Sequence, residues 1–205
     1  MTQAQPLQRL FTYDEFIEWY PNDGKNYELH KGVIFEMPPA SGSHTEVIGF
    51  LVIALIEAIK LQQLSYRTSE STLVKINSST TYKPDLIVIN RENLINEPLW
   101  EKESTLSCPD SIPLVVEIVS TNWQDDYDGK FNDYAAMGIR EYWIVDYKAL
   151  GGRRYIGNPK QRTIFVCELI DGEYQMNPFR GSDRIVSPTF PQLNLTAQQI
   201  FDSVA

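Results

Sequence analysis

The chain has 205 residues, of which 42% are hydrophobic and 22% charged, and its formal net charge is −9. This length fits one globular domain with a sizeable core, which we expect to occupy residues 11–205. No basic segment followed by an apolar run stands at the N-terminus, and the longest apolar helical stretch, residues 47–59, is too short to span a bilayer. These features argue against a secretory signal and a membrane-spanning helix, so we expect a cytoplasmic protein.

The first forty residues predict a helix and a hairpin after a loose start. Residues 1–10 are polar, and chain ends of this kind are commonly held loosely. A capping-box pattern predicts a short helix over residues 12–20. Two short segments, residues 26–30 and 33–37, flank a Lys31-Gly32 turn and predict a β-hairpin.

The main helix is predicted to begin at Ser43. Ser43 and Glu46 have the spacing of a capping box, and the apolar residues within 47–59 form one broad stripe. Glu46 therefore has a sufficient structural role. His44, in the first turn, is equally consistent with a surface position and with a position near an acidic site.

The middle of the chain predicts a group of strands. Residues 64–69, 72–77 and 84–90 have the composition of strands, and residues 113–120 form another. The stretch between the last two, residues 91–112, is polar and rich in turn-forming residues. We expect this stretch to be a surface excursion.

The C-terminal part predicts a strand–helix–strand unit and a second hairpin. A helix over residues 126–138 ends at a glycine, and a strand follows at 141–147, so the unit that starts at residue 113 fits a right-handed crossover. Residues 162–177 predict a hairpin around an Asp-Gly turn, and Thr196 can cap a final short helix. The expected fold class is α+β with an α/β-type core, in which helices flank a mixed sheet.

Two apolar runs of the predicted sheet each carry one acid, Asp85 and Glu117. A buried acid is costly unless it is paired, hydrogen-bonded or bound to a cation. On neighbouring strands the two carboxylates would lie side by side, which suits a hard divalent ion, and the carbonyl of Ile118 is a candidate third ligand. The pair is also consistent with a glycosidase, although the aromatic residues fall mostly at core spacing.

Lys130 lies on a predicted helix among aromatic residues that should point inward. Tyr127, Phe131 and Tyr134 recur with it at helical spacing, so the lysine shares their face. A functional lysine and an Asp126–Lys130 ion pair one turn apart explain this placement equally well.

Three further acids lie in predicted strands. Glu28 belongs to the first hairpin, where it can contact the acidic site, but a half-exposed strand acid explains it as well. Glu141 and Asp146 should face opposite sides of their strand because their separation is odd. We expect Asp146 to cap a turn and Glu141 to pair with Arg140 or Lys130.

Several sequence blocks have a recognisable combined pattern. They are Tyr27-Glu28-Leu29 with Gly32, Met37-Pro38-Pro39 with His44, Pro84-Asp85, Val116-Glu117-Ile118-Val119-Ser120, Lys130 with Tyr134, and Gly138-Ile139-Arg140-Glu141-Tyr142-Trp143-Ile144-Val145-Asp146. Over nearly the whole chain this pattern resembles the Uma-two family of restriction-endonuclease-like proteins, in the PD-(D/E)XK nuclease superfamily. One departure is Val119, where the superfamily usually has lysine, and the resemblance implies that Lys130 supplies the missing ammonium group.

The resemblance implies a restriction-endonuclease-like fold and a metal-dependent endonuclease that hydrolyses phosphodiester bonds, with double-stranded DNA as the expected substrate. Asp85, Glu117 and Ile118 would hold Mg²⁺ or Mn²⁺, with His44 and Glu28 close to them. Lys130 would position the attacking hydroxide or neutralise charge growing on the phosphate. We expect a homodimer, because cutting both strands commonly uses two copies and two-fold dimers are the commonest assemblies.

A basic loop is the candidate nucleic-acid contact. Residues 147–163 contain no acid, and Arg153, Arg154 and Lys160 are among their basic residues. These three could lie along a phosphate backbone, with Tyr155 stacked on a base. A solvated loop that offsets acidic residues elsewhere explains the same cluster equally well.

A second class of function remains open at this point. The chain is also consistent with a catalytically silent nuclease-like scaffold that binds nucleic acid or another protein. Val119 and the net charge of −9 favour this alternative, because nucleic-acid binding normally needs a basic surface. Metal-dependent nicking that is lost on Asp85→Ala would distinguish the two.

Overall fold

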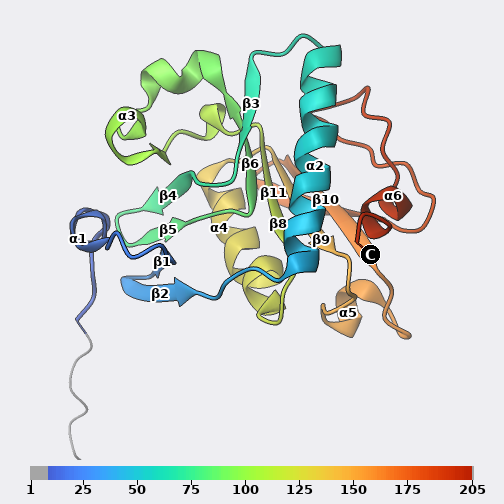
Figure 1. Ribbon diagram of the computed structural model, residues 1–205, viewed down its shortest axis with the longest axis horizontal. Helices are drawn as coiled ribbons and strands as arrows, with labels where there is room; N and C mark the ends of the chain where they lie inside the picture. The colour runs from blue at the N-terminus through green and yellow to red at the C-terminus, as the bar shows by residue number, and fades with distance from the viewer. Residues whose placement is uncertain (1–8, 205) are drawn as a thin grey trace, which may run out of the picture.

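The computed structural model describes residues 9–204, which form two mixed β-sheets with helices packed around them (Figure 1). The predicted α+β class is therefore confirmed, although the strands divide between two sheets. Most of the predicted loose segment, residues 1–8, lies outside the described part of the chain. None of the helices within residues 9–204 is long and apolar enough to cross a membrane.

The N-terminal helix and hairpin form as predicted. Helix α1 (Tyr13–Trp19) begins with a capping box, and β1 (Asn26–His30) pairs antiparallel with β2 (Val33–Met37). The turn between the strands uses left-handed backbone at Lys31 (φ +50°) and Gly32 (φ +83°). A Cβ at Gly32 would also lie 2.9 Å from the Leu10 side chain, so only glycine fits there.

The hairpin belongs to the smaller sheet, whose strand order is β2-β1-β5-β4-β7. Its other strands are β4 (Leu73–Asn77), β5 (Thr80–Tyr82) and β7 (Thr105–Leu106). Strand β5 has only three residues, and the sequence pattern did not predict it. Strand β7 lies in the expected surface excursion, which also contains η1 (Arg91–Asn96), α3 (Trp100–Glu103) and η2 (Pro109–Ser111), none of them predicted.

The larger sheet has six strands in the order β11-β10-β9-β8-β6-β3. They are β3 (Tyr66–Ser69), β6 (Leu86–Asn90), β8 (Leu114–Ile118), β9 (Glu141–Asp146), β10 (Thr163–Ile170) and β11 (Glu173–Phe179). Only β8 and β9 run parallel within this sheet, as expected for a strand–helix–strand unit. The C-terminal hairpin, β10 with β11, was predicted from its turn.

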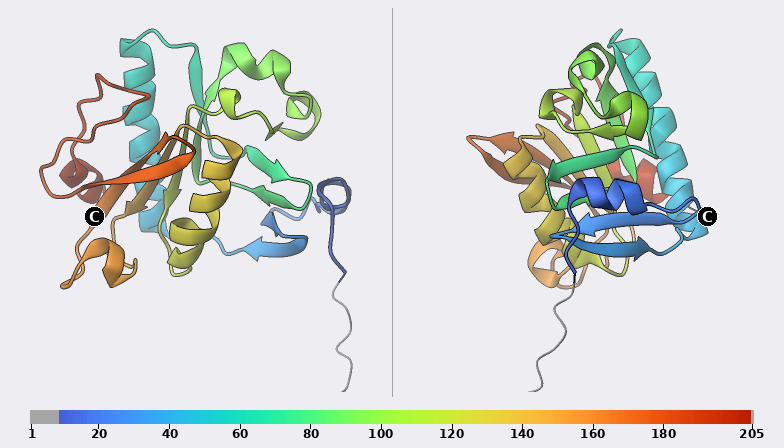
Figure 2. Two further views of the ribbon diagram at one scale, coloured as in Figure 1. Left: turned by 180° about the vertical axis from the view of Figure 1, so that it is seen from behind. Right: turned by 90° about the vertical axis from the view of Figure 1, so that its left-hand side faces the viewer.

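Helices cover both faces of the larger sheet (Figures 1 and 2). Helices α2 (Gly42–Leu61) and α6 (Ala197–Phe201) pack on one face. On the other face lie the helical turn η3 (Asp125–Gly129) and α4 (Lys130–Met137), which ends at Gly138. A further short helix, α5 (Arg153–Ile156), follows β9.

Alternation along β8 decides which face its acid occupies. Leu114 and Val116 belong to the apolar cluster under α2, whereas Val115 and Val119 belong to the cluster under α4. Because side chains alternate along a strand, Glu117 points toward α4. The sheet therefore presents this carboxylate to the helix that carries Lys130.

The cap of α2 differs from the prediction. The helix begins at Gly42, and the Ser41 hydroxyl accepts a hydrogen bond from the His44 N–H at 3.3 Å. The Ser43 hydroxyl instead forms a 2.9 Å hydrogen bond with Tyr147 Oη. Ser43 therefore links α2 to the end of β9, and Glu46 is not part of a capping box.

Candidate active site

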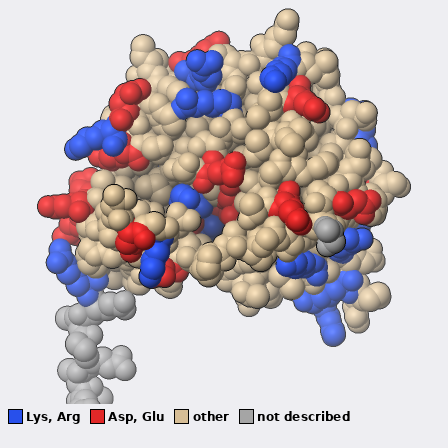
Figure 3. All heavy atoms as spheres, viewed as in Figure 1, with Lys and Arg blue, Asp and Glu red and all other residues tan. Residues whose placement is uncertain are grey.

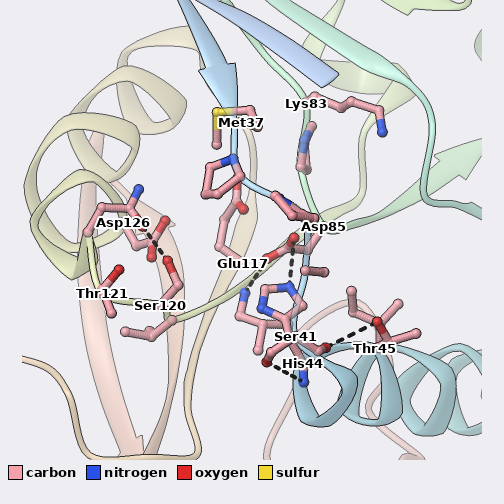
Figure 4. A pocket seen from close by; sticks show the side chains of 18 of the residues that line it. Met37, Ser41, His44, Thr45, Lys83, Asp85, Glu117, Ser120, Thr121 and Asp126 are labelled. Carbon is pink, nitrogen blue, oxygen red and sulfur yellow. Dashed lines mark hydrogen bonds and ion pairs between the residues drawn. The ribbon is translucent and has the colours of Figure 1, made fainter. Parts of the chain in front are cut away.

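A cleft of about 580 Å³ lies at the strand ends along one side of the larger sheet, where β6 begins and β8 and β9 end (Figure 4). Strand β6 is antiparallel to β8, and β9 is parallel to it, so these three strand ends meet at the same edge. The start of α2 and the segment between β2 and α2 form the opposite side of the cleft. Asp85, Glu117 and Lys130 all line it.

The sequence had suggested that Asp85 lies inside a buried strand. In the structure it stands one residue before β6. Leu86 pairs with Val116, so Asp85 reaches the position beside Glu117 on β8. Its Oδ2 accepts a 2.8 Å hydrogen bond from the Ile118 N–H. The side chain remains 26% exposed, which leaves it accessible from the cleft.

Glu117 is a buried carboxylate with a defined orientation. Its Oε1 accepts hydrogen bonds from Lys130 Nζ at 2.9 Å and from Tyr134 Oη at 3.0 Å. Burial raises the pKa of Glu117 to about 7, with Asp85 and Glu28 adding to the shift and Lys130 opposing it. The role of Tyr134 as a hydrogen-bond donor was not predicted, since its spacing indicated only a core position.

Lys130, the first residue of α4, is surrounded by carboxylates. Its Nζ lies 2.9 Å from Glu117, 3.3 Å from Glu28 and 4.0 Å from Asp126. Burial alone would lower the pKa of Lys130, but these acids outweigh burial and hold the pKa well above its usual value. The Asp126–Lys130 pair expected from the spacing is therefore present beside a closer contact with Glu117, and the functional role of Lys130 stays a prediction.

Asp126 is a buried acid that the site prediction omitted. It lines the cleft, and burial raises its pKa well above the usual range of an aspartate. The only sequence signal was its position one helical turn before Lys130. That signal is too common to single out a site residue.

Glu28 is fully buried, which corrects the half-exposed placement considered from the sequence. Its carboxylate contacts His30 Nε2 at 2.7 Å and accepts a hydrogen bond from the Lys83 N–H at 2.9 Å. Burial opposes ionisation, but Lys130, His30 and the Lys83 N–H together lower the pKa of Glu28. This residue connects the smaller sheet to the lysine of α4.

His44 approaches the acids from the first turn of α2. Its Nε2 lies 2.9 Å from Asp85 Oδ1, and Figure 4 shows the imidazole directed toward Asp85 across the cleft. Of the two positions that the sequence left open, the structure has the one near the acids.

The donors present suit a hard cation that uses few protein ligands. Within residues 9–204, no three His, Cys, Asp or Glu side chains form a ready metal-binding group. The candidate ligands in the cleft are instead two carboxylates, those of Asp85 and Glu117. Ile118 lines the same cleft beside them. Mg²⁺ commonly uses one or two carboxylates and keeps several waters, so this set fits it.

The predicted nucleic-acid contacts lie outside the cleft lining. Arg154 pairs with Asp128 at 2.8 Å, and Lys160 Nζ donates to the Leu150 carbonyl at 2.9 Å. Arg153 opens α5 and also does not line the cleft. Tyr155 packs against Tyr127, with ring centroids 4.6 Å apart, so its ring is part of a cluster of aromatic side chains.

Charged side chains on the face seen in Figure 3 do not form a continuous basic band. Lys and Arg stand in separate groups with Asp and Glu between them. Besides Lys130, two lysines line the cleft itself, Lys83 and Lys148. Burial lowers the pKa of Lys83, and the nearby acids Asp85, Glu28 and Glu70 only partly offset this effect.

The two acids of β9 have structural partners. Asp146 accepts hydrogen bonds from the N–H groups of Leu150 and Gly151 at 2.8 Å each, so it caps the turn after the strand as expected. The expectation for Glu141 was wrong. Its carboxylate accepts hydrogen bonds from Trp143 Nε1 at 2.6 Å and from the Thr189 N–H at 2.7 Å, while Arg140 pairs with another acid.

Comparisons with known proteins agree with this fold. A family model named Uma2 and described as "Putative restriction endonuclease" matches residues 13–198. The crystal structure of a "putative nuclease" from Anabaena variabilis ATCC 29413 is similar, with a TM-score of 0.73 and 18% identity over 95% of this chain and 99% of that chain. No curated protein sequence matches. The structural likeness confirms the predicted restriction-endonuclease-like fold.

Proposed function

Because the chain belongs to the Uma2 family, we propose that it is a metal-dependent endonuclease that hydrolyses phosphodiester bonds of nucleic acid, with double-stranded DNA as its substrate. One observation carries this proposal. Asp85, Glu117 and Lys130, which are far apart in the sequence, line one cleft, and Lys130 Nζ lies 2.9 Å from Glu117. A carboxylate pair beside an ammonium group matches the needs of phosphoryl transfer to water.

Mg²⁺ or Mn²⁺ would be held by the carboxylates of Asp85 and Glu117 and by the carbonyl of Ile118. When bound, the ion supplies Lewis-acid polarisation of a phosphate oxygen and lowers the pKa of a bound water. The chain prepares these ligands through its own hydrogen bonds. The Ile118 N–H holds Asp85, and the Tyr134 hydroxyl holds Glu117.

Lys130 would position the attacking water and balance the negative charge that grows on the phosphate. Its ammonium group remains protonated, because the surrounding carboxylates raise its pKa. Glu28 acts as a positioning residue that holds Lys130 from the side of the smaller sheet. His44 plays the corresponding part for Asp85, whose Oδ1 lies 2.9 Å from its Nε2.

A catalytically silent scaffold is the second candidate, and the surroundings of Lys130 favour it. Three carboxylates lie within 4.0 Å of this ammonium group, so it is already engaged before any substrate binds. Residue 119 is valine and cannot replace it. In this function the cleft would bind nucleic acid or a protein without turnover.

A cleavage assay distinguishes the two candidates. Supercoiled plasmid and single-stranded DNA are incubated with the protein in Mg²⁺, in Mn²⁺ and in EDTA, alongside Asp85→Ala. The endonuclease proposal expects nicking with either metal, none in EDTA and none with the variant. Nicking that persists in EDTA would contradict the proposed mechanism, and binding without nicking in either metal would support the scaffold.

Two finer points belong to the same proposal. The protein would act as a homodimer, since paired copies can cut both strands of a duplex. Light scattering after size-exclusion chromatography measures this directly, and a monomer at the concentration of the cleavage assay would contradict it. The cytoplasmic location stays a prediction.

A further inference from the structure

Lys83 and Lys148 line the cleft, but neither ammonium group has an ion-pair partner within the described residues. Lys130, the third lysine of the cleft, is instead held by three acids. A polyanionic substrate needs cations that are free to contact its phosphates. Lys83 and Lys148 are therefore candidates for contacts with further phosphates of the substrate, in addition to the role proposed for Lys130 at the reacting phosphate.

Sheet topology places the two lysines on opposite sides of Glu117. Lys83 stands two residues before Asp85 at the start of β6, and Lys148 follows the end of β9. Strand β8, which carries Glu117, lies between β6 and β9 in the sheet. The order across this edge is consequently Lys83 with Asp85, then Glu117, then Lys148. In Figure 4, Lys83 lies on the Asp85 side of the cleft.

The backbone near each lysine is anchored, while neither ammonium group is held by an acid within the described residues. Lys148 Nζ lies over the Tyr147 ring, 5.1 Å from its centroid, and the residue is exposed. The Lys83 N–H donates to the buried Glu28 carboxylate at 2.9 Å. Lys148 follows Tyr147, whose hydroxyl is hydrogen-bonded to Ser43 on α2 at 2.9 Å. An anchored main chain that carries a cationic side chain without an acidic partner is suited to contacting phosphates along a nucleic-acid strand.

The cleft also needs these charges for electrostatic reasons. Four acids line it, Glu70, Asp85, Glu117 and Asp126, and they repel a phosphate backbone. The basic loop offers less help, because Arg154 and Lys160 are bound to partners within the chain and lie outside the cleft lining.

We propose that Lys83 and Lys148 contact the phosphates on either side of the scissile bond. The nucleic-acid strand would then run across the ends of the β-strands, from the start of β6 past β8 to the end of β9. This inference rests on the proposed nuclease function and specifies how its cleft holds the strand. The contacts are made to the phosphate backbone and are independent of base sequence.

Binding without turnover tests the inference. The full chain and Lys83→Gln/Lys148→Gln are titrated in EDTA against fluorescein-labelled oligonucleotides, single-stranded and duplex, and the anisotropy is followed at several salt concentrations. The double variant should raise Kd about tenfold at low salt and reduce the salt slope by about 2, since each lysine contributes about one phosphate contact. Circular dichroism checks that the variant is folded.

Lys60→Gln/Lys102→Gln is the matched control, because it removes the same charge from exposed lysines. Lys60 lies near the far end of α2, about 27 Å along the helix from Gly42. This control should bind like the wild type. Equal losses of affinity in both double variants would overturn the inference. A loss of affinity confined to Arg154→Gln/Lys160→Gln would also overturn it, and so would a wild-type protein that binds neither oligonucleotide.

Plasmid nicking in Mg²⁺ or Mn²⁺ separates this inference from the proposed function. If the wild type nicks plasmid but the Lys83 and Lys148 variant binds normally, the inference fails and the nuclease function stands. If binding depends on these lysines but no metal supports nicking, the phosphate contacts stand and the hydrolase function fails.

Discussion

Glu117 and Glu141 are buried acids on neighbouring strands, and they face opposite sides of the same sheet. Glu117 contacts a lysine and lines a cleft. Glu141 accepts hydrogen bonds only from uncharged groups, the Trp143 indole and the Thr189 N–H, within the part of the chain described here. Burial raises the pKa of both. Burial is therefore common to the two acids, and what distinguishes Glu117 is its charged partner and its place in the lining of the cleft.

The largest expected difference between the two acids is in catalysis. Glu117→Gln should reduce the rate of plasmid nicking about 10³-fold, because it removes one of two carboxylates proposed to hold the metal. Glu141→Gln, the matched change on β9, should stay within about threefold of wild type once the folded fraction is measured, since its side chain does not line the cleft. Equal reductions of the nicking rate in both variants would contradict the proposal that Glu117, and not Glu141, acts in catalysis.

Lys130→Met tests the charge balance around Glu117. Removing the ammonium group leaves three acids without their counter-charge, which should lower the free energy of unfolding by about 3–5 kcal/mol. Urea denaturation measures this change. Adding Glu117→Gln to Lys130→Met should recover part of the loss, because one of the unpaired charges is gone. A double variant less stable than Lys130→Met alone would contradict this account.

Glu141→Ala should affect stability without a charge effect. It leaves the Trp143 and Thr189 N–H groups without their acceptor, and each buried unsatisfied donor costs about 1–3 kcal/mol. We expect a loss of about 2–4 kcal/mol in urea denaturation that is insensitive to salt. A strong salt dependence would mean that Glu141 has a charged partner after all.

The pH dependence of stability tests the surroundings of Glu117 without a substitution. The folded-state pKa of Glu117 is about 7 against an ordinary value of 4.5, so the folded state binds the proton more tightly than the unfolded state. The stability due to this group is fully present below pH 4.5 and falls as the pH rises through about 7. Thermal unfolding in EDTA should show this decline, and Glu117→Gln should flatten it. A wild-type protein that gains stability between pH 5 and 8 would contradict the prediction.

Local patterns predicted the parts of this fold that local chemistry determines. The Lys31-Gly32 and Asp171-Gly172 turns both use positive φ values, and each hairpin formed around them. The cap of α2 was misplaced by two residues. Ser43 fitted the local pattern, but its hydroxyl is bound to Tyr147, a contact between residues far apart in the chain that no local pattern reveals.

The candidate site was predictable to the extent that its residues lie in recognisable strands. Glu117 on β8 and Asp85, directly before β6, were identified because an acid beside apolar residues is unusual. Asp126 and the burial of Glu28 were missed, since both depend on how α4 packs against the two sheets. The partners of Glu141 were missed for the same reason, because Thr189 lies 48 residues away.

The contact between Glu28 and Lys130 joins the first hairpin to the helix after β8. A shortened protein that begins after this hairpin would keep the entire six-stranded sheet and still lose one counter-charge of its central lysine. The hairpin therefore belongs to the surroundings of the candidate site, and a shortened version of this protein should retain it.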